Sequence, residues 1–165
     1  LTVDLTSYDL IWASPPCQHY TRLQIEHDSH PDLLAVTRDR LIASGKPYII
    51  ENVGGAPLID PIKLTGQQFG LRVNRPRFFE SNIPMSEPPW ERAEGITMHT
   101  RGDGGQYYAV YGHEVGTLNE WGHAMGVSHI TTKRGIAQSI PPDFSEWCCN
   151  EVLRYMYETT KDGHT

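Results

Sequence analysis

The chain has 165 residues, a formal net charge of −6 at pH 7 and a hydrophobic fraction of 38%, which is ordinary for a globular protein. This length predicts one domain, over 1–165, that is large enough for a sizeable core. No apolar run reaches the roughly 18 residues of a membrane span, so we expect no membrane partner. The acidic balance argues against broad, nonspecific adhesion to nucleic acid. Three cysteines are too few for a disulfide framework, which favours a reducing, cytoplasmic setting.

The first predicted elements are a strand, a helix and a second strand. Residues 8–13 have the apolar pattern of a buried strand, which the two following prolines must end because proline cannot donate a ladder hydrogen bond. A helix is expected over 31–44, opened by a proline and followed by a glycine. A second buried strand over 47–50 ends at Glu51. This order predicts a βαβ unit with two parallel strands.

Shorter elements are predicted in the second half of the chain. Residues 73–80 place arginines on alternate positions, as a strand does, and 107–111 are a second short strand. The intervening residues 84–106 are rich in proline, glycine and charge, so we expect an irregular loop. A helix over 118–125, capped by a threonine, and a longer one over about 143–157 complete the prediction.

Two residue types that suit chemistry follow the first two predicted strands. Cys17 comes directly after the prolines, and Glu51 ends the neighbouring strand. Because parallel strands end at the same edge of a sheet, where ligands bind, we expect Cys17 to be an accessible thiol that faces Glu51 across a cleft. Each residue also has an ordinary explanation, since a lone cysteine is more often a small buried hydrophobe and Arg75 and Arg77 suit a polar sheet edge. The ordered series of thiol, carboxyl and arginines is what indicates a site.

Four short motifs occur in a particular order along the chain. They are PCQ at 16–18, ENV at 51–53, RPR at 75–77 and AQSIPP at 137–142. Together they resemble the DNA cytosine carbon-5 methyltransferase family, and most of all its short phage-type members, over most of the chain. The first motif is similar to the family's nucleophile motif and the second to its glutamate motif. The third resembles the end of its Gln-x-Arg-x-Arg motif, and the fourth resembles the segment that returns to the cofactor.

This resemblance implies a fold and a reaction. The fold is an α/β, Rossmann-like methyltransferase sheet, here N-terminally truncated. The reaction transfers a methyl group from S-adenosyl-L-methionine to carbon 5 of cytosine in double-stranded DNA, on a base that has left the helix stack. By resemblance Cys17 is the nucleophile that adds to carbon 6, Glu51 is the ring acid and Arg77 positions the base. Arg75 supports the site or contacts a phosphate.

The resemblance also implies residues that contact the cofactor and DNA. Those that remain from the family's cofactor contacts are Pro16, Gln138 and Ser139. Those expected to meet DNA are Gln18, at the start of the loop that closes over it, and Arg22 and Arg72, which would contact phosphates. The target-recognition region, about residues 81–116, is very short for the family.

The chain departs from the family pattern in its cofactor motifs. No Phe-x-Gly-x-Gly loop precedes Leu1, Val73 stands where the family has glutamine, and Gln138 replaces the usual asparagine. We therefore expect an upstream segment or a second chain to supply the cofactor site, and this chain alone to bind S-adenosylmethionine weakly or not at all. Two alternatives stay open: a non-catalytic DNA-binding or assembly module derived from such an enzyme, or one subunit of a split methyltransferase.

Two other classes of methyltransferase match the motifs of this sequence less well. Exocyclic-amine methyltransferases use Asp/Asn-Pro-Pro-aromatic, which residues 14–17, Ser-Pro-Pro-Cys, resemble except that a thiol replaces the aromatic ring. RNA cytosine carbon-5 enzymes take their nucleophile from a Thr-Cys motif, which this sequence lacks. The histidines and cysteines do not have the spacing of zinc ligands, so we expect no metal site.

Overall fold

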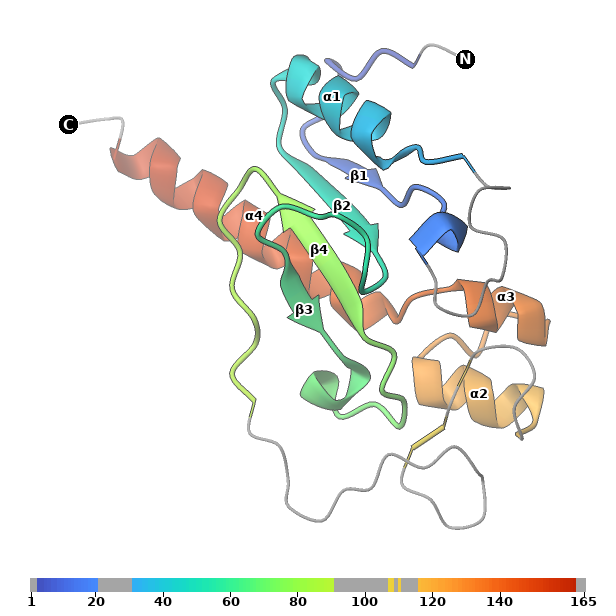
Figure 1. The fold of residues 1–165 in the computed structure, drawn as a ribbon. Helices are drawn as coiled ribbons and strands as arrows, with labels where there is room; N and C mark the ends of the chain where they lie inside the picture. Colours follow the sequence, from blue (N-terminus) through green and yellow to red (C-terminus); the bar gives the residue numbers. More distant parts are fainter. Residues whose placement is uncertain (1–2, 21–30, 91–106, 109, 111–115, 163–165) are drawn as a thin grey trace. The chain divides into compact units, whose positions relative to one another are not determined.

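The computed structural model describes residues 3–20, 31–90, 107–108, 110 and 116–162 and has a mixed α/β fold (Figure 1). Its elements in chain order are β1 (Ile11–Ala13), η1 (Gln18–Tyr20), α1 (Leu34–Ser44), β2 (Tyr48–Asn52), β3 (Ile62–Leu64), η3 (Gly66–Phe69), β4 (Arg77–Ser81), α2 (Leu118–Met125), α3 (Lys133–Gln138) and α4 (Pro142–Asp162). The chain divides into two compact units. The first unit comprises Leu1–Lys63, Arg77–Ser86 and Asn150–Thr165, and the second unit comprises Leu64–Pro76 and Glu87–Cys149.

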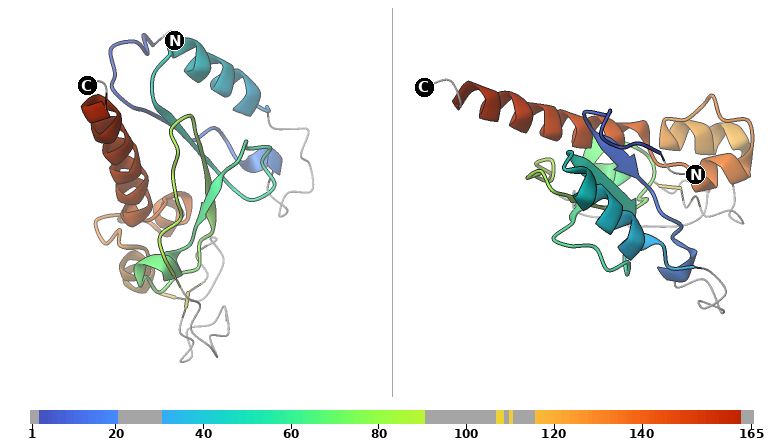
Figure 2. Two further views of the ribbon diagram at one scale, coloured as in Figure 1. Left: turned by 90° about the vertical axis from the view of Figure 1, so that its left-hand side faces the viewer. Right: turned by 90° about the horizontal axis from the view of Figure 1, so that it is seen from above.

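The four strands form one mixed sheet in the order β1-β2-β4-β3. β1 pairs with β2 in parallel, with Ala13 opposite Ile50, and β2 pairs with β4 in antiparallel, with Glu51 opposite Phe79. All five residues of β2 are buried, as expected for a central strand. α1 connects β1 to β2 and covers one face of this strand pair (Figure 1, Figure 2). The predicted βαβ unit with parallel strands is therefore confirmed.

The core of the first unit forms on both faces of β2. On one face, Leu34 and Leu41 of α1 pack against Tyr48 and Ile50, two residues apart on the strand. On the other face, the Trp12 and Phe79 rings meet edge to face with centroids 5.7 Å apart. This alternation assigns each residue of β2 and β4 to one face of the sheet.

A buried ion pair joins α1 to β4. The Arg38 Nε and Nη2 atoms donate to the two carboxylate oxygens of Glu80, both at 2.7 Å, and Glu80 is only 2% exposed. The same pair also reaches the connection between β2 and β3: Arg38 Nη2 donates to Pro57 O, and the Ile59 N–H donates to Glu80, each at 2.8 Å. The hydrogen bond to Glu80 raises the pKa of Arg38. This network holds the loop that follows β2 in one conformation.

The second unit has a separate core around Trp121. This ring is fully buried, and the other buried members of the cluster are Val73, Val110, Met125, Val127 and Ile136. The Thr117 hydroxyl accepts the Glu120 N–H while the Glu120 carboxylate accepts the Thr117 N–H, so α2 begins with a capping box. The predicted helix over 118–125, with its threonine cap, is confirmed.

Other element boundaries differ from the prediction. The strand expected over 73–80 is wrong in its first half, because β4 begins at Arg77. Arg75 has a φ of 42°, which is outside the strand region, and Pro76 has no N–H for a ladder. The strand expected over 107–111 falls partly outside the described residues, and its Tyr108 forms an isolated bridge with Val73. Among the helices of the described ranges, none has both the length and the apolar character needed to cross a membrane.

Replacing Glu80 by glutamine should lower the free energy of unfolding by about 3–5 kcal/mol, because it leaves the Arg38 guanidinium without its buried counter-charge. Urea unfolding followed by circular dichroism measures this change. Glu158→Gln, at an exposed position of α4, is the matched control and should shift stability by less than about 0.5 kcal/mol. Equal unfolding midpoints for both variants would contradict the role given to the ion pair.

Candidate functional site

Two of the predicted site residues contact each other directly. Glu51 lies on β2 and Arg77 is the first residue of β4. The Arg77 Nε atom is 3.0 Å from Glu51 Oε1, and their side chains are 13% and 11% exposed. The register explains this contact: Glu51 is opposite Phe79, so Arg77 is its diagonal neighbour on the same face of the sheet.

The ion pair has an electrostatic reason. A carboxylate that is largely removed from water loses hydration free energy, and a hydrogen-bonded counter-charge compensates for that loss. Arg77 supplies this counter-charge to Glu51 through Nε, a donor with a fixed direction in the guanidinium plane. The carboxylate is therefore held in one orientation, which a group that donates or accepts a proton at a fixed ring atom requires.

Cys17 lies on the loop that follows β1. It is partly exposed, and its carbonyl accepts the Tyr20 N–H at 2.9 Å, which forms the short turn of η1. The Asn52 Nδ2 atom donates to Pro15 O at 3.1 Å, so the residue next to Glu51 anchors the loop two residues before Cys17. Asn52 is 1% exposed, which makes this hydrogen bond a buried one.

The strand directions bring these groups to one edge of the sheet. β1 and β2 are parallel, so the Cys17 loop and Glu51 are both at carboxyl ends. β4 is antiparallel to β2, so its amino end, where Arg77 lies, is at the same edge. Within the first unit the structure therefore places the predicted nucleophile loop, acid and base-positioning arginine on three adjacent strands.

The turn after Cys17 is tied to the start of α1. The Tyr20 hydroxyl donates a hydrogen bond to Asp32 Oδ1, which also accepts the Leu34 N–H at 3.0 Å. Burial and this hydrogen bond raise the pKa of Tyr20 to about 12, and the same hydrogen bond lowers the pKa of Asp32. Gln18 in this turn is exposed, as a DNA-contacting residue needs to be. Arg22 lies outside the described residues.

The remaining predicted site residues belong to the second unit, except for Pro16, which is exposed beside Cys17. Arg72 is exposed, and its guanidinium lies over the Tyr108 ring, 5.4 Å from the centroid. Gln138 is exposed at the end of α3, and Ser139 is the half-buried residue that caps this helix. Arg75 is buried and donates to backbone carbonyls. Most of the predicted target-recognition region at 81–116 lies outside the described residues.

Asn52 and Asp32 were not predicted as site-supporting residues. Asn52 had a sequence signal, because a short amide directly after Glu51 at a buried strand end suits a hydrogen bond to the neighbouring strand's loop. Asp32 had a weaker signal, as an acidic residue in the first turn of the predicted helix. In the part of the chain that the structure describes, no three histidine, cysteine or acidic side chains are grouped as a metal site would need.

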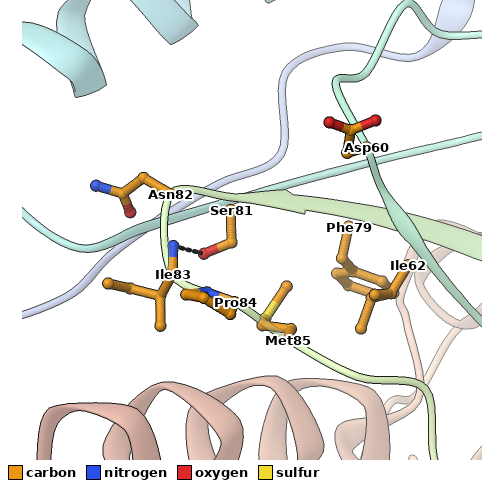
Figure 3. Close-up of a pocket in the computed structure, with 8 residues that line it drawn as sticks. All are labelled: Asp60, Ile62, Phe79, Ser81, Asn82, Ile83, Pro84 and Met85. Carbon is orange, nitrogen blue, oxygen red and sulfur yellow. Dashed lines mark hydrogen bonds between the residues drawn. The ribbon is translucent and has the colours of Figure 1, made fainter. Parts of the chain in front are cut away.

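A pocket of about 280 Å³ lies at the other end of β4 (Figure 3). Its lining residues are Asp60, Ile62, Phe79, Ser81, Asn82, Ile83, Pro84 and Met85. The polar groups there bind backbone atoms: Ser81 Oγ donates to Tyr48 O and accepts the Ile83 N–H, and Asn82 bonds to Lys46 O and the Tyr48 N–H. In Figure 3 the Asp60 carboxylate points away from the apolar lining. The pocket includes no predicted site residue.

Comparisons with known proteins give no further assignment. A scan against protein-family models finds no match, and a search of curated proteins finds none either. The site is therefore interpreted from its own residues and their geometry.

Cys17 should react with iodoacetamide before the other two cysteines do. Cys148 is fully buried, and burial raises the pKa of Cys149, which lowers its thiolate fraction at pH 8. Peptide mass spectrometry after a short exposure of the native protein locates the label. Cys17→Ser should remove the fast phase of labelling. Alkylation of Cys149 ahead of Cys17 would show that the loop does not expose its thiol.

Proposed function

We propose that this chain is the catalytic portion of a DNA cytosine carbon-5 methyltransferase, built on a Rossmann-like methyltransferase sheet. The observation that carries the proposal is the Glu51–Arg77 ion pair at the sheet edge where the anchored Cys17 loop also begins. A thiol, a carboxyl and a guanidinium are the groups that nucleophilic addition to a cytosine ring requires.

Cys17 starts the proposed reaction. Its thiolate adds to carbon 6 of the cytosine, and the electron pair of the carbon 5–carbon 6 double bond becomes available at carbon 5. Carbon 5 then takes the methyl group, after which it loses its proton to a base. The electrons of that bond restore the ring double bond and expel the Cys17 thiolate, so the enzyme returns to its starting state.

Glu51 and Arg77 make this addition possible. Negative charge develops on the ring as the thiolate adds, and a proton shared with Glu51 at nitrogen 3 and a contact with the exocyclic amine neutralise it. Arg77 holds Glu51 through Nε, and a planar guanidinium is a group that suits a hydrogen bond to the ring oxygen. These two side chains distinguish cytosine from thymine, whose nitrogen 3 already carries a proton.

S-adenosyl-L-methionine, when bound, supplies the electrophilic methyl group. Of its predicted contacts, Pro16 and Gln138 are exposed and Ser139 is half-buried. Pro16 offers apolar surface, and Gln138 and Ser139 offer polar groups, of the kinds that suit cofactor contacts. In this proposal an upstream segment or a second chain completes the site.

Double-stranded DNA is the proposed substrate. The target base has to leave the helix stack to reach a group at the edge of a sheet. Gln18 follows Cys17 on the exposed surface of the same turn, where it can meet the strand that the base has left. Arg72 is exposed and suits a phosphate contact, which acts on affinity in a salt-dependent way.

DNA that contains 5-fluorocytosine should trap the protein, completed by its cofactor-binding segment or partner, as a covalent adduct. Fluorine cannot leave carbon 5 as a cation, so elimination fails and Cys17 stays attached to carbon 6. A denaturing gel of protein, fluorinated duplex and S-adenosylmethionine measures the adduct. Cys17→Ser should abolish it, because a serine hydroxyl is a far weaker nucleophile near neutral pH.

Glu51→Gln should slow adduct formation by about 100-fold or more while DNA affinity changes little, because it removes a proton donor and keeps the shape. Glu158→Gln is the control with the same chemical change. An undiminished adduct in Cys17→Ser would mean another nucleophile. No adduct with the wild-type protein, when DNA and cofactor are both bound, would favour the non-catalytic DNA-binding module.

A further inference from the structure

Arg75 has contacts that the phosphate or active-site role expected from the sequence does not explain. It is 3% exposed, and its guanidinium donates to three backbone carbonyls of the second unit. Nη1 donates to Val110 O at 2.6 Å, Nη2 donates to Ser139 O at 2.7 Å, and Nη2 also donates to Ala137 O. The Ala137 and Ser139 carbonyls belong to the residues on either side of Gln138, which is one of the predicted cofactor contacts.

The carbonyls of Ala137 and Ser139 are at the C-terminal end of α3. The last carbonyls of a helix have no donor within the helix, and a cation at this end also offsets the negative end of the helix dipole. α3 has only six residues, and helices this short depend on contacts outside themselves. Arg75 satisfies the carbonyls before and after Gln138 at once, so it determines the path of the backbone through that residue.

The backbone at Arg75 supports the same conclusion. Its φ of 42° is in the left-handed region, which residues with a Cβ adopt only when their surroundings require it. The preceding residues are fixed: Val73 is buried in the Trp121 core, and Asn74 O accepts the Gly66 N–H at 2.8 Å. With this backbone conformation, the Arg75 side chain reaches the carbonyls of the 137–139 segment.

We propose that Arg75 is a positioning residue for the cofactor, which holds Ala137 and Ser139 so that the Gln138 side chain is presented to S-adenosylmethionine. This inference rests on the proposed function and assigns Arg75 to the cofactor side of the reaction. It also gives the two arginines of the RPR motif different roles: Arg77 positions the base and holds Glu51, and Arg75 acts on the cofactor through the backbone. Its Nη1 and Nη2 atoms donate to backbone carbonyls of this chain.

The first test measures backbone order and does not depend on catalysis. In Arg75→Gln, hydrogen exchange of the Ser139 amide, which donates to Gly135 O and Ile136 O, should be faster by at least about tenfold. The Val127 amide, which donates to Gly122 O in the same unit, should exchange as in the wild type. Arg75→Lys keeps the charge but has one donor nitrogen in place of Nη1 and Nη2, so it should restore part of the protection. Arg72→Gln, at the exposed arginine three residues earlier, is the matched control and should change neither amide.

The second test measures kinetics in the protein completed by its cofactor-binding segment or partner. Arg75→Gln should raise the KM for S-adenosylmethionine by at least about tenfold, and leave the KM for DNA and its salt dependence unchanged. Arg72→Gln should leave the KM for S-adenosylmethionine unchanged, raise the KM for DNA, and weaken the salt dependence of DNA binding. A lysine at position 75 should restore part of the cofactor KM.

Each contrary outcome has a separate meaning. Unchanged Ser139 exchange in Arg75→Gln would overturn the positioning role. Faster exchange with an unchanged cofactor KM would overturn the link to the cofactor and leave the proposed reaction intact. A reduced salt dependence of DNA binding in Arg75→Gln would make Arg75 a phosphate contact. If Arg75→Gln does not fold, Arg75→Lys decides the question by the same measurements. An inactive wild-type protein would contradict the proposed function without changing the exchange result.

Discussion

A carboxylate on a central, buried strand needs a counter-charge, and Arg77 meets this need for Glu51 at 3.0 Å. The constraint acts on two strands at once, because the ion pair crosses the diagonal between β2 and β4. The fixed position of β2 also affects the loop that follows the neighbouring strand, β1. Asn52 follows Glu51 in the fixed strand, and its amide holds Pro15 of the loop after β1. The position of the Cys17 loop therefore depends, through this one hydrogen bond, on the same strand that carries Glu51.

β4 is held from both faces. Arg77 points to the face that carries Glu51, while Glu80, on the opposite face, binds Arg38 of α1. Each of these charges is largely buried and each has its counter-charge, so a shift of β4 by one residue would break both pairs. A reaction that adds a thiolate to a ring needs the acid to stay within hydrogen-bond distance of one ring nitrogen. In the proposed reaction, the two ion pairs on opposite faces of β4 would supply that rigidity.

The sequence alone predicted the parts that depend on local patterns. The strand–helix–strand order, the parallel pairing and the capped helix at 118–125 follow from apolar spacing and from Gly, Pro and Thr positions, and the structure confirms them. The start of β4 was predicted wrongly, because Arg75 has a left-handed φ and its side chain binds carbonyls 35 to 64 residues away, which no local pattern shows. β3 has three residues and α3 six, which is too short for a periodic signal.

The sequence indicated which residues to consider for the candidate site, and it did not indicate the contacts that hold them in place. Cys17, Glu51 and Arg77 came from an ordered set of motifs, and the structure adds the ion pair between the last two. The hydrogen bond from Asn52 to Pro15 spans 37 residues, so the sequence could suggest a donor at Asn52 but not its partner. The role of Arg75 required the fold as well, because its motif neighbour Arg77 has the same side chain and a different set of contacts.

The central claim is that Cys17 adds to carbon 6 of cytosine, and tritium release tests it most directly. Addition makes carbon 5 nucleophilic, so it takes a proton from water, and elimination can then expel tritium from DNA labelled at that carbon. The exchange needs no methyl transfer and tests the thiol and Glu51 alone. The account predicts that the protein bound to [5-³H]cytosine DNA releases tritium to water, and that Cys17→Ser, bound to the same DNA, releases none above background. Equal release by both proteins, or no release by the wild type while it is bound to DNA, would contradict it.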